Sequence, residues 1–394
     1  MHGSPYIEKN LDELCDITGG LWIGKSGTMR QARIIRNTNF KAGGHLDFDD
    51  VAEHLVEDRQ FSTRELKPGD IILEKSGGGP KQPVGRVALF QLDKPGYTYS
   101  NFTARIRVKD AGMIDPRFLW HCLQNLYMKG VTNSLQRQTS GIRNLETRRY
   151  GKLLIPVPPL KTQKQIVSTL DQVLELKTKR DSAYKILSDF APALFDQMFG
   201  NSIDQNFLTK KLSDVVTVKG GGTPSKQMGK FWNGVIPWVS PKDMGDEFIE
   251  DTEDHITQEA IAESATNLIP PNSLLVVTRS GILKHTVPIA ITARPVAINQ
   301  DIKALIPSAE INPIFLYWQL RGLERHLLTL IKTGATVQSL NTDALTGLDI
   351  LVPPKDKQVE FVELVENSAK IRGKQLHRGQ LIDEAFSALT AQLL

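Results

Sequence analysis

The sequence carries the same pattern twice, with the second copy about 200 residues after the first. The order of the repeated segments never changes, and the small drift in their spacing is what loop insertions produce. A period of this length is far too long for a solenoid repeat. It predicts two copies of one domain. The matching segments are 11–20 with 212–221, 68–73 with 271–276, 115–120 with 312–317, and 155–159 with 350–354.

Length and composition fit a globular protein of two or three domains. The chain has 394 residues, 40% of them hydrophobic and 23% charged, so each half can bury its own core. A net charge of +4 is compatible with nucleic-acid binding without establishing it. Two cysteines, both in the first half, predict neither a disulfide framework nor a cysteine metal site. No apolar run is long enough for a membrane span, so we expect a cytoplasmic protein without a membrane partner.

Each half begins with a mixed region of short strands and one helix. Short apolar runs bounded by proline, glycine and asparagine predict strands at 70–73, 84–90, 273–278 and 287–292. Asp115 and Asn312 each precede a proline and are good N-caps. They predict helices over 116–129 and 313–332. The expected fold class is α+β.

A long proline-poor helix follows each mixed region. Apolar residues recur there in steps of three and four, and each helix of about 40 residues would be about 60 Å long. We expect the two helices to pair antiparallel as a coiled coil; the alternative is that each packs on its own domain. The predicted boundaries are a first domain over 1–159, a central helix over 160–200, a second domain over 201–354 and a C-terminal helix over 355–394.

The segment from Gly19 to Ser26 matches the phosphate-binding pattern G-x-x-x-x-G-K-[ST]. In such a loop Lys25 would reach the phosphates and Ser26 the magnesium ion, so a P-loop ATPase is an alternative reading. The loop does not follow a buried apolar strand, however. The second copy, from Gly220 to Lys226, keeps the glycines and the lysine but lacks the full motif. The sequence therefore favours a contact loop over a nucleotide site.

No set of catalytic residues is shared by the two copies. Asp301 and Lys303 could form the tail of a metal-dependent nuclease site, but the first copy has Thr103-Ala-Arg105 there. The histidines show no ligand spacing. We therefore expect no catalytic, cofactor-binding or metal-binding residues in this chain.

The copies share apolar strands, turns and helix caps, and they differ in polar loops. Those loops are rich in side chains that contact phosphates and base edges. We predict DNA contacts from both. In the first copy these are Lys25, Ser26, Arg30, Arg33, Asn37, Lys75, Lys81, Gln82, Arg143 and Asn144; in the second they are Thr223, Ser225, Lys226, Lys242, Thr278, Arg279, Lys284, Asn299, Gln300 and Gln338.

These segments together resemble the specificity (S) subunit of type I restriction-modification systems, over essentially the whole chain. The resemblance is carried by Gly220-Gly-Gly-Thr-Pro-Ser-Lys, Ile236-Pro-Trp-Val-Ser-Pro-Lys-Asp, Leu268-Ile-Pro-Pro-Asn-Ser, Ala297-Ile-Asn-Gln-Asp, Asn312-Pro-Ile-Phe-Leu-Tyr, Ile155-Pro-Val-Pro-Pro and Leu194-Phe-Asp-Gln-Met-Phe-Gly. The first copy departs from the pattern at Ile35-Arg-Asn-Thr-Asn-Phe and Glu74-Lys-Ser-Gly-Gly-Gly.

The resemblance implies a non-catalytic DNA-binding subunit with two target-recognition domains. Each domain would read one half of a bipartite site in double-stranded DNA. The long helices would set the spacer and dock two methyltransferase (M) subunits, which restriction and translocase (R) subunits then join. S-adenosylmethionine, ATP and Mg²⁺ would belong to those partners. A scaffold that binds only proteins is a further alternative.

Overall fold

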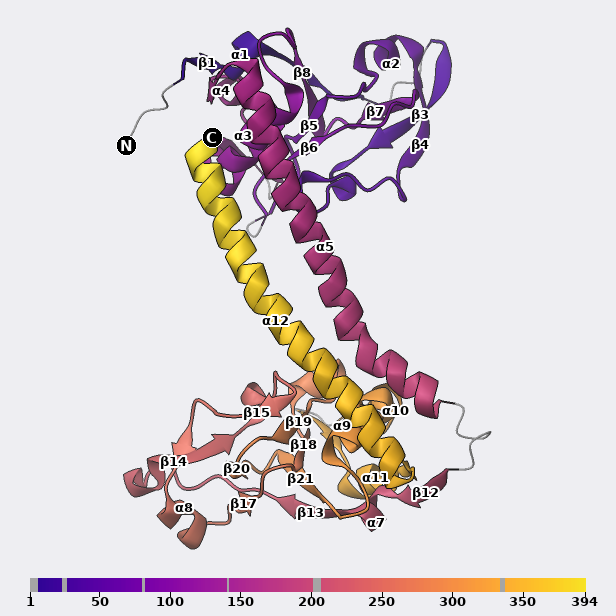
Figure 1. Ribbon diagram of the computed structural model, residues 1–394, viewed down its shortest axis with the longest axis vertical. Helices are drawn as coiled ribbons and strands as arrows, with labels where there is room; N and C mark the ends of the chain where they lie inside the picture. The colour runs from indigo at the N-terminus through magenta and orange to yellow at the C-terminus, as the bar shows by residue number, and fades with distance from the viewer. Residues whose placement is uncertain (1–5, 23–26, 80–81, 140–141, 201–206, 334–336) are drawn as a thin grey trace. The chain divides into compact units, whose positions relative to one another are not determined.

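The computed structural model describes residues 6–22, 27–79, 82–139, 142–200, 207–333 and 337–394. It divides into two compact units, coloured indigo to magenta and magenta to orange for most of their length (Figure 1). Unit 1 comprises Met1–Asp181 together with His377–Leu394. Unit 2 comprises Ser182–Leu376. The end of the chain thus completes the unit formed by its beginning.

Unit 1 contains a four-stranded antiparallel sheet and a three-stranded mixed sheet. The larger sheet has the order β2-β8-β5-β6 and the smaller one β4-β3-β7, in which β3 runs parallel to β7. The strands are β2 (Cys15–Gly19), β3 (Met29–Ile35), β4 (Ala52–Glu57), β5 (Ile71–Glu74), β6 (Val87–Leu89), β7 (Tyr97–Tyr99) and β8 (Thr103–Val108).

Unit 1 also contains short strands and helices outside its two main sheets. A two-stranded pair, β1 with β11, ties the start of the chain to the segment before the first long helix. These elements are β1 (Glu8–Asn10), α1 (Leu11–Leu14), η1 (Asn37–Asn39), η2 (Ala42–Gly44), α2 (Asp58–Arg64), α3 (Pro116–Met128), η3 (Val131–Leu135), β9 (Gln136–Thr139), β10 (Ile142–Leu145), α4 (Thr147–Tyr150) and β11 (Leu154–Pro156).

Unit 2 has the same two sheets, each extended by one edge strand. The orders are β13-β21-β18-β19-β15 and β16-β14-β20-β17, with β14 parallel to β20. The strands are β13 (Val216–Gly220), β14 (Trp232–Val239), β15 (Phe248–Ile249), β16 (His255–Ile256), β17 (Leu268–Ile269), β18 (Leu274–Val277), β19 (Ile289–Thr292), β20 (Val296–Ile298) and β21 (Ile302–Pro307).

The remaining elements of unit 2 include counterparts of those in unit 1. They are β12 (Leu208–Lys211), α7 (Leu212–Val215), η4 (Gly229–Phe231), η5 (Pro241–Asp243), α8 (Gln258–Glu263), η6 (Gly281–Lys284), α9 (Pro313–Gly322), α10 (Glu324–Thr329), β22 (Ile331–Thr333), β23 (Gln338–Leu340), α11 (Thr342–Thr346) and β24 (Asp349–Val352). The predicted α+β class and the internal repeat are both confirmed, because strand order and direction match between the units.

The predicted N-caps at Asp115 and Asn312 are confirmed. The Asp115 carboxylate accepts hydrogen bonds from the backbone of the first turn of α3, and the Asn312 side chain does the same for α9. The predicted single helix over 313–332 is wrong. It ends at Gly322, a poor helix former, resumes as α10, and gives way to strand β22.

The two long helices are α5 (Leu160–Phe199) and α12 (Lys355–Leu393). In unit 1, Lys177 pairs with Asp383 at 2.7 Å and the Arg180 guanidinium donates to the Gly379 carbonyl at 3.0 Å. Residue numbers rise along α5 as they fall along α12, so this contact is antiparallel. In unit 2, Phe195 of α5 lies 5.6 Å from Phe361 of α12 between ring centroids.

Each unit has one main hydrophobic core, and both long helices contribute to it. Ile166 and Leu170 of α5 are buried in the core of unit 1, where Phe386 of α12 also packs. Phe199 and Phe361 are buried in the core of unit 2. Both arrangements considered from the sequence therefore occur, since each helix contacts the other and also packs on its own domain.

Candidate nucleic-acid interface

In each unit a β-hairpin lies against the loop that follows an inner strand of the larger sheet. Hairpin β9–β10 reaches the loop after β5 through a bridge between Ser76 and Asn144. Hairpin β22–β23 reaches the loop after β18 through a bridge between Arg279 and Ser339. The same backbone geometry therefore presents two different sets of polar side chains.

In unit 1 this junction gathers four of the predicted DNA contacts: Asn37, Lys75, Arg143 and Asn144. The Asn37 amide donates to the Ser76 carbonyl at 2.6 Å, and the Ser76 hydroxyl donates to the Asn144 side-chain oxygen at 2.7 Å. The Arg143 carbonyl accepts from the backbone of the same loop at 3.0 Å. Burial lowers the pKa of the Lys75 ammonium.

In unit 2 the corresponding junction is organised around Asp301. Its carboxylate accepts from the Arg279 guanidinium at 2.6 Å and from the Asn299 amide at 3.3 Å. Its carbonyl accepts from the Thr278 hydroxyl at 3.1 Å. Its carboxylate also accepts from the Gln300 amide at 3.4 Å.

Two more predicted residues lie at this junction. The Thr223 hydroxyl donates to the Gln300 side-chain oxygen at 2.6 Å, and the Gln338 carbonyl accepts from the Ser280 backbone at 3.2 Å. Six predicted residues thus converge in unit 2: Thr223, Thr278, Arg279, Asn299, Gln300 and Gln338.

Sequence reasoning missed Asp301 as the residue that orders this cluster. The sequence pattern marks that aspartate only as part of a nuclease motif with Lys303. An acidic residue directly after Asn299-Gln300, in an otherwise basic set of loops, was the available signal. The Asp301 carboxylate holds the Arg279 guanidinium and the Asn299 and Gln300 amides in fixed orientations.

Two predicted arginines lie instead on the smaller sheet of unit 1. Arg30 pairs with Asp58 at 3.2 Å and covers the Phe61 ring, with its guanidinium carbon 4.2 Å from the ring centroid. Arg33 pairs with Glu53 at 3.1 Å, and this hydrogen bond raises the pKa of the guanidinium. Both cations already have acidic partners and lie outside the junction.

The remaining described residues are dispersed. Lys242 pairs with Glu253 and Asp254, at 2.7 and 3.0 Å, and both contacts raise the pKa of its ammonium. Gln82 contacts the Arg86 guanidinium. Three more are exposed without joining the cluster: Ser225, Lys226 and Lys284.

Lys25, Ser26 and Lys81 lie outside the described residues. The elements on either side of the Gly19–Ser26 motif are nevertheless described. Strand β2 precedes it and strand β3 follows it, whereas a P-loop joins a strand to a helix. The ATPase alternative therefore lacks its structural context.

The segments 35–40 and 238–243, at which the first copy departs from the second, form the same turn. In unit 1 the Arg36 backbone N–H donates to the Asn39 side chain at 2.8 Å. In unit 2 the Ser240 N–H donates to the Asp243 side chain at 2.8 Å. The first copy's departure from the family pattern at this point therefore changes side chains and preserves the backbone.

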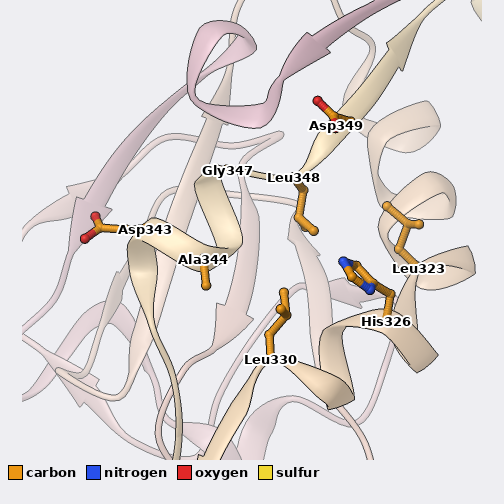
Figure 2. A pocket seen from close by; sticks show the side chains of 8 residues that line it. All are labelled: Leu323, His326, Leu330, Asp343, Ala344, Gly347, Leu348 and Asp349. Atoms are coloured by element: carbon orange, nitrogen blue, oxygen red, sulfur yellow. The ribbon is translucent and has the colours of Figure 1, made fainter.

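A cavity of about 450 Å³ in unit 2 is separate from the junction. It is an open pocket lined by residues of α10, α11 and the start of β24 and by residues adjoining them. Leu330, Leu348 and His326 point toward one another there, while Asp343 points away (Figure 2). None of the predicted DNA contacts lines this cavity, so the candidate interface is a surface formed by loops.

The described part of the chain offers neither a cluster of metal ligands nor a helix suited to a membrane. Within it, no group of three histidine, cysteine or acidic side chains is placed to hold a metal ion. Nor is any helix within those ranges long and apolar enough to cross a bilayer.

Curated relatives of the chain are specificity subunits. It is 34% identical over 226 residues to the EcoR124I/EcoR124II type I restriction enzyme specificity subunit of Escherichia coli, which covers 55% of this chain and 56% of that protein. It is 28% identical over 180 residues to the MjaIX specificity subunit of Methanocaldococcus jannaschii, covering 43% and 40%. The chain thus spans about half the length of the curated relatives it matches.

Solved structures share the fold along the full chain. The type I restriction-modification S subunit from M. genitalium matches with a TM-score of 0.60 at 13% identity, covering 100% of this chain and 97% of that one. A chain from a study of assembly and conformational transition in a type I R-M system matches with a TM-score of 0.58 at 17% identity, covering 99% and 98%. The family model described as the type I restriction modification DNA specificity domain matches twice, at residues 4–183 and 205–381. The chain therefore belongs to the type I restriction-modification DNA specificity family.

Proposed function

We propose that this chain is the DNA sequence-specificity subunit of a type I restriction-modification complex. Each unit reads one half of a bipartite target, and the chain itself performs no catalysis. One observation carries the proposal. The hairpin and strand-end loop meet in the same way in both units, through the Ser76–Asn144 and Arg279–Ser339 bridges, yet they present different polar side chains.

This contrast is what two independent readers of different sequences require. A shared backbone places the loops on DNA in the same way, and different side chains select different base edges. For base reading, the junction of unit 1 offers an arginine and two asparagines. The junction of unit 2 offers an arginine, an asparagine and a glutamine held around Asp301, with Gln338 beside them. The two half-sites should therefore differ.

The long helices offer a surface for methyltransferase subunits. Their stretch in unit 2 exposes large apolar side chains that the unit itself leaves uncovered: Tyr184 at 39%, Ile186 at 69%, Leu364 at 41%, Ile371 at 49% and Leu376 at 55% exposure. Contiguous apolar surface that stays exposed is typical of sites that bind other proteins. Two methyltransferase subunits would dock on the helices, and restriction and translocase subunits would join them.

The chemistry of such a complex lies in the partners of this chain. S-adenosylmethionine, ATP and Mg²⁺ would bind to the methyltransferase and restriction subunits, in the cytoplasm where the DNA is. A specificity chain needs only to contact DNA and hold its partners.

The deciding experiment is methylome sequencing of cells that express the methyltransferase subunits with and without this chain. We expect a bipartite asymmetric motif that appears only with the chain. A second chain, in which residues 201–354 are replaced by a copy of 1–159, should methylate a palindromic site made of the first half. Loss of the first half-site in that chain would contradict independent reading by the two units.

The same preparation separates the alternatives. Footprinting of the purified chain on target DNA, with and without methyltransferase subunits, should show protection of both half-sites; no protection in either case would favour a protein-only scaffold. Turnover of ATP that disappears in Lys25→Ala would favour the ATPase.

The helices are also proposed to set the spacer between the half-sites. Four residues inserted after Lys177 add about one turn, roughly 6 Å, to α5. A matching insertion before Asp383 in α12 keeps the turn in register with its partner. The methylated motif should then gain one or two base pairs of spacer, and an unchanged spacer would contradict the proposal.

A further inference from the structure

Both units place two glycines directly after or at the end of the first strand of the larger sheet. The second position of each pair must be glycine, because another segment of the main chain passes close to it. A Cβ added to Gly20 would lie 1.9 Å from the Ser100 carbonyl oxygen, and one added to Gly221 would lie 2.0 Å from that of Ile298. No other residue type fits at these two positions without moving the chain.

The first glycine of each pair has a different environment. A Cβ added to Gly19 would have one neighbour among the described residues within 4 Å, the Lys75 ammonium nitrogen at 3.7 Å. A Cβ added to Gly220 would likewise have one, the Lys303 ammonium nitrogen at 3.2 Å. Neither glycine has a backbone neighbour that demands it. In both units a lysine ammonium group therefore lies next to the main chain of the first glycine.

The two lysines come from positions that do not correspond. In the antiparallel ladders, Gly19 pairs with Ala104 and Gly220 pairs with Lys303. The position of Lys303 is therefore Ala104 in unit 1, and the alignment of Lys303 with Arg105 expected from the sequence is wrong by one residue.

The position of Lys75 is in turn a threonine in unit 2. The carbonyl of Lys75 accepts from the Leu145 N–H at 2.7 Å, and the carbonyl of Thr278 accepts from the Leu340 N–H at 2.8 Å. Unit 1 thus has lysine and alanine where unit 2 has threonine and lysine. Lys75, directly after β5, and Lys303, within β21, thus each place an ammonium group beside the first glycine of its unit.

The main-chain carbonyls of the two glycines already accept hydrogen bonds from other side chains. The Gly19 carbonyl is already occupied by the Arg64 guanidinium at 2.9 Å, and the Gly220 carbonyl by the Asn267 amide at 3.0 Å. No acidic side chain among the described residues pairs with Lys75 or Lys303, although both lysines are half-buried. Burial without an opposite charge lowers the pKa of Lys75. A cation held in this way is stabilised by an incoming anion.

We propose that Lys75 and Lys303 each hold a backbone phosphate of DNA at the same point of the two units, beside the first glycine. The absent side chain at that glycine leaves room for the phosphate. The inference rests on the proposed DNA-reading function and adds a contact that is independent of sequence. The loops that read bases differ between the units. The ammonium group is present at the same point of both units, although different sequence positions supply it.

The test measures DNA affinity of the full chain, assembled with methyltransferase subunits, at several salt concentrations. Lys75→Ala and Lys303→Ala should each weaken binding to target and to non-target duplexes by a similar factor. Each should also reduce the slope of log affinity against log salt by about one, the value for one phosphate contact. Lys152→Ala is the matched control in unit 1, since that lysine pairs with Asp12, and should leave the slope unchanged.

A rescue experiment tests the correspondence itself. Lys75→Thr combined with Ala104→Lys gives unit 1 the arrangement of unit 2, and should restore the slope that Lys75→Thr loses. Because Ala104 is buried, the reverse exchange in unit 2, Lys303→Ala with Thr278→Lys, provides a second variant. Failure of both folded double variants to restore the slope would overturn the inference.

Other outcomes are equally decisive. If Lys75→Ala weakens binding only to the target and the slope stays constant, the lysine reads a base and the inference is wrong. If the unaltered complex binds DNA and both alanine variants match it, the inference fails while the proposed function stands. If the unaltered complex does not bind duplex DNA, both fail together.

Discussion

The side-chain oxygen of Gln163 accepts a hydrogen bond of 2.8 Å from the backbone N–H of Asp115. The same side chain donates to the carbonyls of Met113 and Pro158, at 3.0 and 2.7 Å. This buried glutamine therefore ties the first turn of α5 to the N-cap of α3. It fixes the point at which the long helix leaves the domain.

Gln358 makes the equivalent three contacts in unit 2. Its oxygen accepts from the Asn312 N–H at 2.8 Å, and its amide donates to the carbonyls of Glu310 and Pro353 at 3.1 and 2.8 Å. Both glutamines are fully buried or nearly so. The repeat thus extends to individual hydrogen bonds at the base of each helix.

We predict that Gln163→Leu lowers the free energy of unfolding by about 1–3 kcal/mol, because it leaves buried backbone groups without partners. Urea denaturation followed by circular dichroism measures the change. Gln165→Leu, on an exposed position of the same helix, is the control and should be close to neutral. Equal effects of the two variants would show that the three hydrogen bonds contribute little.

Glu74 and Arg86 form a bidentate ion pair beneath the junction of unit 1, with distances of 2.7 and 3.0 Å. Glu74 is 3% exposed. Arg86→Met leaves that carboxylate buried without a partner and should cost about 3–5 kcal/mol of stability. The double variant Glu74→Met with Arg86→Met should be more stable than the single one, as thermal denaturation can show. A double variant no better than Arg86→Met would contradict this account.

His121 is buried beside Asp171, with 3.1 Å between the ring nitrogen and the carboxylate, and Arg117 pairs with the same carboxylate. Burial lowers the pKa of His121 from its ordinary value of 6.5, despite the opposing effect of Asp171. The unfolded chain therefore binds a proton more readily than the folded one does. Stability from this residue is present above about pH 6.5 and is lost as the pH falls below it.

His121→Gln should accordingly reduce the loss of stability between pH 7.5 and pH 5.5, measured by urea denaturation at the two values. The exposed His285→Gln serves as control and should keep the dependence of the unaltered chain. If the His121→Gln variant loses as much stability between pH 7.5 and pH 5.5 as the unaltered chain, His121 is not the cause of that loss.

Two glycines in α12 should respond differently to alanine. A Cβ added at Gly373 meets nothing within 4 Å, so Gly373→Ala should raise stability by about 0.5–1 kcal/mol through helix propensity. A Cβ added at Gly379 would lie 3.0 Å from Arg180 Cδ, so Gly379→Ala must displace the guanidinium from the Gly379 carbonyl. Its melting temperature should lie below that of Gly373→Ala; the reverse order would show that Arg180 moves freely.

Features coded over a few neighbouring residues were predictable from the sequence. The repeat, the central strands, the caps at Asp115 and Asn312 and the two long helices all follow from local spacing of apolar, turn and capping residues. The break between α9 and α10 was missed, because apolar periodicity continued past Gly322 and the pairing of β22 with β23 prevailed over it.

The sequence by itself determined that this protein is one scaffold used twice, with polar loops as the varying part. Only the tertiary structure decided which polar side chains lie close enough to interact. Arg30, Arg33 and Lys242 have acidic partners brought in from other segments, whereas Lys75 and Lys303 reach equivalent places from positions that do not align. The reason is physical: strand and helix patterns depend on near neighbours in the chain, but a charge is balanced or left free by groups that only folding brings within a few ångströms.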